Sequence, residues 1–377
     1  MDNSNHEILK NLTRIVVKVG TSSLTHRTGK LNLFRLEKLI RQLADLANQG
    51  KQVILVSSGA VGAGIGKIGL KSRPKTIPEK QAAAAVGQGV LMHMYEKIFA
   101  EYGQIVGQVL LTREDLADRK RYLNARHTLF SLLQYGVIPI VNENDTVAVE
   151  EIRLGDNDTL SALVACLVDA DLLVLLSDIE GLYDGNPQKD ANAHLLPFVQ
   201  EINAEIEALA GGAGSEFGTG GMNTKIQAAK MAMNSGIPMV IADSKREDVL
   251  RQIVMGNCPG TLFAPKDTPL HTKKRWIAYG SSIQGKITVD AGAQDVLMND
   301  GKSLLPIGIT KIEGNFEAGN VVSILDLAGH EFARGIVNYG SEEIEKIKGK
   351  NTTEIHKILG YKDYDEVIHR DNLALSQ

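Results

Sequence analysis

From residue 14 to about residue 255, short apolar runs alternate with longer stretches in which apolar residues recur at helical spacing. The short runs are typical of buried strands; they are Arg14–Val19, Gln52–Ser57, Gln104–Leu111, Val137–Val141, Leu172–Ser177 and Pro238–Ala242. The helical stretches are Leu33–Ala47, Thr76–Ala100, Tyr122–Tyr135, Thr159–Val168, Thr224–Asn234 and Glu247–Met255. This alternation predicts an α/β fold with a mainly parallel sheet, covered by helices on both faces in three layers.

Local signals mark where two of these helices begin. Asn32 stands at the N-cap position of the first helix. Thr76 and Glu79 have the spacing of a capping box, which opens a long helix that Gly103 ends. These signals come from residue types whose side chains or backbone conformations satisfy helix termini, so they support the helix boundaries independently of the apolar pattern.

The pattern changes near Pro265. The stretch Pro265–Arg275 is polar and is predicted to be a linker. From Trp276 to Lys350 the apolar runs are short and broken by glycines, which is typical of a small, mostly-β domain. We therefore predict two domains, residues 1–265 and residues 275–361.

Composition and charge exclude several classes of protein. The 377 residues suit two domains, and 43% hydrophobic and 23% charged residues are near the average for folded soluble proteins. The net charge of -4 gives no reason to expect a nucleic acid or another polyanion as partner. Two cysteines, Cys166 and Cys258, are too few for a disulfide framework or a Cys-based zinc site.

The cysteine content and the apolar pattern also indicate where in the cell the protein is expected. Scarce cysteines indicate a reducing, cytoplasmic setting. The first 12 residues lack the apolar core of a secretory signal, and no apolar run approaches the roughly 20 residues that a membrane-spanning helix needs. We therefore expect a cytoplasmic protein without a membrane partner.

Small polar residues follow several of the predicted strands. They are Gly20–Ser22, Ser58–Ala60, Asn142–Asp145, and Ser177 with Asp178. One such loop is ordinary in an α/β protein. Because open α/β sheets bind ligands beyond the carboxyl ends of their strands, four of them together predict a site at that edge.

Two lysines are placed to meet phosphate groups. Lys18 lies inside the first strand, one residue from its carboxyl end, where a charge is costly unless it meets a partner or a ligand. The alternative is an edge-strand lysine that faces solvent. Lys225 lies in the first turn of a helix that follows the glycine-rich segment Gly218–Gly221, and a helix N-terminus attracts anions. The alternative there is a flexible surface loop with an ordinary helical lysine.

A third polar segment, Gly155–Asp158, precedes another predicted helix. Asp and Asn are favoured helix caps, and capping alone would explain one of them. Three in a row leave two side chains for another purpose.

Other motifs argue against alternative chemistries. The segment Gly64–Gly69 has the G-x-G-x-x-G pattern, but it begins well after the strand ends, and no acidic residue follows at the distance that a ribose-binding acid needs. A dehydrogenase is therefore not expected. The chain has no G-x-x-x-x-G-K-[ST] segment, which excludes a P-loop kinase, and its His residues lack zinc-binding spacing.

Together these segments resemble the amino-acid kinase family, and within it the members that phosphorylate glutamate. The resemblance is carried by Val16–Ser22, Val56–Ala60, Pro139–Asp145, Gly155–Asp158 and Gly218–Lys225. The second domain resembles a PUA domain through Gly285–Asp290 and Ser303–Ile309. The lysine and glycine motifs are shared by several amino-acid kinases, whereas the Asn142–Asp145 run with an appended PUA domain is typical of the glutamate-phosphorylating members.

The resemblance implies ATP-dependent phosphorylation of the side-chain carboxylate of L-glutamate, the first step toward proline. It implies three catalytic residues, Lys18, Lys225 and Asp158, with Asp158 positioning both lysines. ATP would be held by Lys18, Ser177, Asp178, Thr219, Gly220, Gly221, Met222, Asn223, Thr224 and Lys225. Glutamate would be held by Ser58, Gly59, Asn142, Asp145, Asp156 and Asn157.

The same resemblance implies the cofactors and partners. Mg²⁺ is expected with ATP, with no dedicated protein cage and no metal ligand assigned. Proline is expected to inhibit by competing with glutamate. A homo-oligomer and functional coupling to glutamate-5-semialdehyde dehydrogenase are also implied.

Two other functions stay open. One is another amino-acid kinase, acting on aspartate or acetylglutamate. The other is an RNA-binding or RNA-modifying protein, since PUA domains resemble modules of RNA-modifying enzymes. Charge argues against RNA, because residues 271–350 hold ten Lys or Arg and ten Asp or Glu, without a basic excess.

Overall fold

The computed structural model describes residues 7–26, 28, 30–148, 157–187, 190, 192–209, 221–266 and 272–375. The chain divides into two compact units. The first comprises Met1–Asp115 and Lys120–Pro269, and the second comprises Leu116–Arg119 and Leu270–Gln377. Each unit has its own sheet and its own apolar core.

The first unit is built on an eight-stranded sheet with the order β3-β4-β2-β1-β5-β7-β8-β6. Its strands are β1 (Arg14–Val19), β2 (Gln52–Val56), β3 (Val106–Leu111), β4 (Ile138–Glu143), β5 (Leu172–Ser177), β6 (Phe198–Val199), β7 (Met239–Asp243) and β8 (Thr261–Phe263). The six strands from β3 to β7 in this order are parallel, while β8 is antiparallel to β7. The predicted parallel sheet is therefore present, with an antiparallel addition at one edge.

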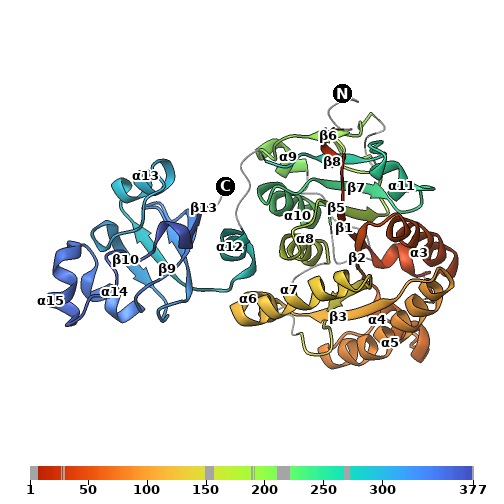
Figure 1. Ribbon diagram of the computed structural model, residues 1–377, viewed down its shortest axis with the longest axis horizontal. Helices are drawn as coiled ribbons and strands as arrows, with labels where there is room; N and C mark the ends of the chain where they lie inside the picture. Colours follow the sequence, from red (N-terminus) through yellow and green to blue (C-terminus); the bar gives the residue numbers. More distant parts are fainter. Residues whose placement is uncertain are drawn as a thin grey trace. The chain divides into compact units, whose positions relative to one another are not determined.

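Helices cover both faces of this sheet (Figure 1). They are α2 (Thr21–Leu24), α3 (Leu33–Asn48), α4 (Ala60–Ile68), α5 (Ile77–Glu101), α6 (Arg113–Ala117), α7 (Arg119–Gln134), α8 (Asn157–Leu167), α9 (Ala204–Leu209), α10 (Met222–Asn234) and α11 (Val249–Val254). Apolar side chains of α3, α5 and α11 pack against Ile15, Val17 and Val19 of β1. Since side chains alternate along a strand, Lys18 faces the opposite side, where α8 and α10 pack together.

The glycine-rich segment after β2 differs from what its composition suggests. It forms helix α4, which packs closely against α5. A Cβ at Gly64 would lie 1.8 Å from the carbonyl oxygen of Ala83, and one at Gly87 would lie 1.7 Å from the carbonyl oxygen of Ala60. These glycines therefore serve the close approach of two helix backbones. The G-x-G-x-x-G pattern lies within this helix and its C-cap rather than in a phosphate-binding turn.

The second unit contains a five-stranded sheet with the order β10-β9-β11-β12-β13. Its strands are β9 (Ile283–Val289), β10 (Ile309–Glu313), β11 (Val321–Leu325), β12 (Glu331–Ile336) and β13 (Leu373–Leu375). Its helical segments are α12 (Thr272–Arg275), η1 (Trp276–Gly280), α13 (Ala291–Asn299), η2 (Pro306–Gly308), α14 (Ser341–Ile347), η3 (Thr352–Glu354), α15 (Ile355–Leu359) and η4 (Arg370–Asn372). The mostly-β prediction agrees with this sheet.

The predicted linker needs a correction at its end. Residues 272–275 form helix α12, and the side chain of Arg275 is buried. The following residue, Trp276, donates a hydrogen bond from Nε1 to the carbonyl oxygen of Leu116 at 3.0 Å. The polar composition of this stretch does not indicate this hydrogen bond, because its acceptor lies about 160 residues away in the chain.

Candidate active site

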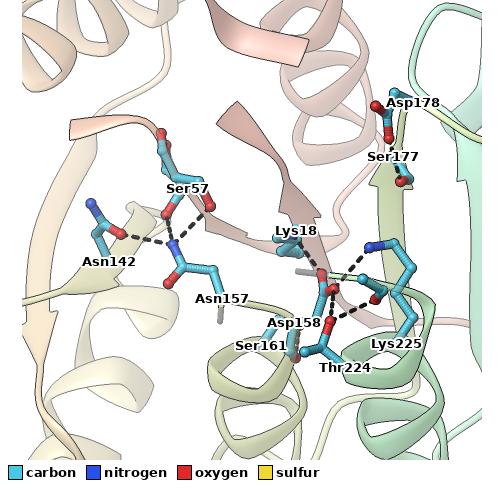
Figure 2. Close-up of polar contacts among 12 residues, drawn as sticks. Lys18, Ser57, Asn142, Asn157, Asp158, Ser161, Ser177, Asp178, Thr224 and Lys225 are labelled. Atoms are coloured by element: carbon cyan, nitrogen blue, oxygen red, sulfur yellow. Dashed lines mark hydrogen bonds and ion pairs between the residues drawn. The ribbon is translucent and has the colours of Figure 1, made fainter. Parts of the chain in front are cut away.

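A buried carboxylate joins two lysines at the carboxyl edge of the sheet. Asp158, in the first turn of α8, lies 2.5 Å from Nζ of Lys18 through Oδ1 and 3.0 Å from Nζ of Lys225 through Oδ2. The carboxylate is fully buried, and both lysines are 6% exposed. Figure 2 shows the three side chains converging from β1, α8 and α10. The two ammonium groups and one carboxylate leave a net charge of +1 there.

This arrangement offsets the cost of burying charge. An isolated buried ammonium or carboxylate would lose its hydration without compensation. Here each lysine meets a carboxylate oxygen, and Asp158 also accepts a hydrogen bond from Oγ1 of Thr224 at 3.0 Å. The excess positive charge therefore stands at a fixed place, near the N-terminus of α10, where an anion is stabilised further.

The start of α10 holds most of the described residues that were predicted to bind ATP. Gly221 is the N-cap of this helix, and Met222, Asn223, Thr224 and Lys225 form its first turn. Oγ1 of Thr224 also donates to the carbonyl oxygen of Gly221 at 2.8 Å, which fixes this turn. The predicted residues Thr219 and Gly220 lie outside the described residues.

Ser177 and Asp178 lie at the carboxyl end of β5, the strand beside β1. Oγ of Ser177 donates to Oδ1 of Asp178 at 3.2 Å. Ser177 is buried, whereas Asp178 is exposed. Both are on the same edge of the sheet as the lysine pair (Figure 2).

A second group of polar side chains surrounds Asn157, next to Asp158 in the chain. Nδ2 of Asn157 lies 2.5 Å from the carbonyl oxygen of Ser57, 2.9 Å from Oγ of Ser58 and 2.9 Å from Oδ1 of Asn142. A carbonyl oxygen only accepts hydrogen bonds, so the amide must present its nitrogen to it. Oδ1 of Asn157 therefore points away from these oxygens (Figure 2) and is available only as an acceptor.

Two of the other predicted glutamate-binding residues, Gly59 and Asp145, are among the described residues. Gly59 caps α4 with φ of 95°, in the left-handed region that favours glycine, and its turn directs Ser58 toward Asn157. Asp145 follows β4 and is half-buried. Asp156 lies outside the described residues.

Strand β4 is longer than predicted, which changes the setting of Asn142. The strand runs to Glu143, so that Asn142 pairs with Leu110 inside the sheet rather than standing in a loop. These polar residues can continue the strand because β3 supplies hydrogen-bond partners for their backbone. The side chain of Asn142 has hydrogen-bond partners as well. Its Oδ1 accepts from Asn157 Nδ2, and its Nδ2 donates to Oε1 of Gln88 at 2.8 Å.

Three residues of this group were not predicted from the sequence. Ser57 Oγ lies 2.7 Å from the hydroxyl oxygen of Tyr95, which is fully buried, and burial raises the pKa of Tyr95 so that its phenol stays protonated. Gln88 contacts Asn142 as described. Tyr95 and Gln88 lie in the middle of α5 and carry no local sequence signal. Ser57 precedes the predicted Ser58 and was assigned only to the strand.

No group of three or more His, Cys, Asp or Glu side chains is placed to hold a metal ion within the described ranges. In the same part of the chain, no helix is both long enough and apolar enough to cross a membrane.

Comparison with protein families agrees with this fold. Residues 13–243 match the amino acid kinase family, and residues 285–359 match the PUA domain. Since the first match covers more than half of the chain, the protein belongs to the amino acid kinase family.

Similar curated proteins narrow the class further. A glutamate 5-kinase from Moorella thermoacetica is 62% identical over 97% of this chain and 97% of that protein. Glutamate 5-kinases from Carboxydothermus hydrogenoformans and Caldanaerobacter subterraneus subsp. tengcongensis are 60% and 58% identical, over 98% and 96% of this chain and over 99% and 97% of their own lengths. Within the amino acid kinase family, the chain therefore belongs with the glutamate 5-kinases.

Proposed function

We propose that this chain transfers the γ-phosphoryl group of ATP to the side-chain carboxylate of L-glutamate, with Lys18, Asp158 and Lys225 at the site of transfer. The observation that carries the proposal is the buried pair of lysines held by one carboxylate at the carboxyl edge of the sheet. The relatives named glutamate 5-kinase support the choice of substrate.

The residues suit transfer to a carboxylate. A glutamate side chain has an ordinary pKa of about 4.3, so it is ionised at neutral pH and attacks the γ-phosphorus without a general base. The enzyme must then align two anions and neutralise the charge on the transferred group. Lys18 and Lys225 supply that charge, and Asp158 keeps both ammonium groups in place.

The division between the two ligands follows the geometry. Ser177, Asp178 and the first turn of α10 lie on the β5 side of Lys18, whereas Ser58, Asn142 and Asn157 lie on the β2 and β4 side. We place ATP on the former side and glutamate on the latter, with Lys18 between them. Thr219, Gly220 and Asp156 stay part of the proposal through their sequence motifs.

Mg²⁺ belongs to the proposal through ATP. It neutralises charge on the β- and γ-phosphates when it is bound with the nucleotide. Mg²⁺ commonly keeps several water ligands and binds through substrate phosphates with one or two carboxylates. The site fits such an ion, because the exposed carboxylate of Asp178 beside Ser177 is an oxygen donor of the kind that binds Mg²⁺ together with substrate phosphates.

Regulation and assembly rest on family resemblance alone. We propose that proline competes with glutamate, because it shares the α-carboxylate and a cationic nitrogen but has no side-chain carboxylate to phosphorylate. A cytoplasmic homo-oligomer that is functionally coupled to glutamate-5-semialdehyde dehydrogenase completes the proposal.

The test is ADP release by the purified chain with ATP, Mg²⁺ and a panel of carboxylate substrates. The panel holds glutamate, aspartate and acetylglutamate at equal concentrations. Glutamate is expected to give the highest kcat/KM. Turnover with aspartate or acetylglutamate in place of glutamate would assign the chain to another amino-acid kinase, and ADP release with none of them would overturn the proposal.

A further inference from the structure

A hydrogen-bond chain leads from the middle of α5 to Asn157. Oε1 of Gln88 accepts from Nδ2 of Asn142 at 2.8 Å, and Oδ1 of Asn142 accepts from Nδ2 of Asn157 at 2.9 Å. Gln88 is partly buried and follows Gly87, which packs against the carbonyl oxygen of Ala60 at the crossing of α5 with α4. That close crossing fixes where the helix presents Gln88.

Each amide in this chain has a defined orientation. If Asn142 were flipped, its nitrogen would face the nitrogen of Asn157 and the backbone N–H of Glu143, which now donates to Oδ1 of Asn142 at 2.9 Å. Three donors would then meet without an acceptor, and buried donors that are left unsatisfied destabilise that orientation. The acceptor oxygen of Gln88 completes the favoured orientation by taking the Asn142 N–H.

The orientation matters for the ligand that Asn157 can meet. With its nitrogen turned to Ser57, Ser58 and Asn142, Asn157 offers an oxygen that only accepts hydrogen bonds (Figure 2). Among the groups of an amino acid, the α-ammonium group is the one that only donates. The oxygen of Asn157 thus suits the α-ammonium group and repels a carboxylate.

From this chain we infer that Gln88 is a positioning residue for recognition of the substrate's α-ammonium group, acting through Asn142 on Asn157. The inference rests on the proposed function, because it assumes that the substrate is glutamate. It assigns to helix α5 a part in selecting α-amino acids over dicarboxylates of the same length.

The test compares Gln88→Met with Gln88→Glu in the full chain. Methionine keeps the length and helix propensity of glutamine but has no oxygen acceptor, whereas glutamate keeps an acceptor oxygen at the same reach. Gln88→Met is expected to raise KM for glutamate about tenfold, equivalent to about 1.4 kcal/mol. KM for ATP stays within about twofold, and Gln88→Glu restores most of the affinity for glutamate.

A matched control lies on the same helix. Gln81, two turns earlier, donates a hydrogen bond from Nε2 to the carbonyl oxygen of Ala148 at 3.4 Å, and Ala148 does not belong to the Asn157 group. Gln81→Met is expected to leave both KM values unchanged. Gln88→Ala, which also removes the acceptor, serves in place of Gln88→Met if circular dichroism shows that the methionine variant does not fold.

Glutarate is a useful comparison substrate, because it has both carboxylates of glutamate but no ammonium group. We expect the ratio of kcat/KM for glutamate to that for glutarate to fall in Gln88→Met. A KM for glutamate that does not change, equal rises for glutamate and ATP, or a Gln88→Glu variant as impaired as Gln88→Met would overturn the role of Gln88. Failure of the unaltered chain to phosphorylate glutamate would instead overturn the proposed function and this inference with it.

Discussion

At the scale of single residues, the site depends on one carboxylate that serves two ammonium groups. Asp158 has no exposed surface. Lys18 reaches it from strand β1 and Lys225 from helix α10, which are far apart in the chain. Removing either lysine leaves the other paired with Asp158, so the fold keeps a compensated charge. The positive charge available to the transferred phosphoryl group falls from +1 to zero.

The first prediction follows from that charge count. Lys18→Ala and Lys225→Ala are each expected to lower kcat by at least about 100-fold, which corresponds to about 2.7 kcal/mol of transition-state stabilisation. The measurement is ADP release at saturating ATP and glutamate. Lys230→Ala is the control, because Lys230 lies on the same helix and pairs with Glu207 instead. Near-normal turnover in a folded Lys18 or Lys225 variant would contradict the assignment.

The second prediction separates the two ligands. Asp145→Ala and Asn157→Ala are expected to raise KM for glutamate far more than KM for ATP, because their proposed contacts are to the amino acid. Loss of a buried hydrogen bond to a charged group costs roughly 2–5 kcal/mol. Steady-state kinetics with each substrate varied in turn provide the measurement. Equal losses for both ligands would mean that these residues serve ATP as well.

The third prediction concerns proline. If proline occupies the glutamate pocket, saturating glutamate should relieve its inhibition, and the Asp145→Ala variant should lose proline sensitivity together with glutamate affinity. Inhibition curves at several glutamate concentrations measure this. Proline inhibition that persists unchanged at saturating glutamate would place proline at another site.

At the scale of secondary structure, the crossing of α4 and α5 shapes the side of the site where we propose that glutamate binds. Helix α4 begins at Ala60, directly after Ser58 and Gly59, and α5 carries Gln88 and Tyr95. The crossing is close because Gly64 and Gly87 lack side chains. The position of the Ser58 turn therefore depends on two glycines that are not among the proposed ligand-binding residues.

The fourth prediction tests this crossing with two glycines on one helix. A Cβ at Gly87 would overlap the Ala60 carbonyl, whereas a Cβ at Gly89 would meet nothing within 4 Å. Gly87→Ala is expected to destabilise the fold by about 1–3 kcal/mol and to raise KM for glutamate. Gly89→Ala is expected to stabilise α5 by about 0.5–1 kcal/mol. Urea unfolding measures the free energy of unfolding of both variants. Equal changes in the two variants would show that the helix crossing is not tight.

The elements that could be predicted from the sequence are those marked by residues close together in the chain. Asn32 was expected to cap α3, and its side chain accepts a hydrogen bond from the backbone N–H of Arg35. Helix α4 was not predicted, because its glycines have low helix propensity and only packing against α5 explains them. Strand β8 has three residues, too few for a recognisable pattern.

The same distinction holds for the site. Lys18 and Ser58 could be proposed from the sequence because strand ends in a parallel sheet indicate where ligands bind. Gln88 and Tyr95 lie in mid-helix, and their contacts with Asn142 and Ser57 span 54 and 38 residues of the chain. No local pattern marks such contacts, so only the folded structure reveals them.

At the scale of the whole molecule, the two units are expected to have different roles. All of the described residues assigned to chemistry, from Lys18 to Lys225, belong to the first unit. Lys266, near its end, still donates its backbone N–H to the carbonyl oxygen of Met233 at 3.0 Å. The second unit includes the segment Leu116–Arg119. In this segment, the guanidinium of Arg119 lies 5.1 Å from the centre of the Trp276 ring.

The last prediction is that a truncated chain ending at Lys266 folds and phosphorylates glutamate with kcat within about tenfold of the full chain, a barrier change of about 1.4 kcal/mol or less. The truncation removes Trp276 and with it the hydrogen bond to Leu116, so a lower melting temperature is expected. Trp276→Ala in the full chain is the control, because it removes the same contact and keeps the second sheet. ADP release is measured after circular dichroism has shown that both proteins are folded. A folded but inactive truncation beside an active Trp276→Ala chain would mean that the second unit completes the active site.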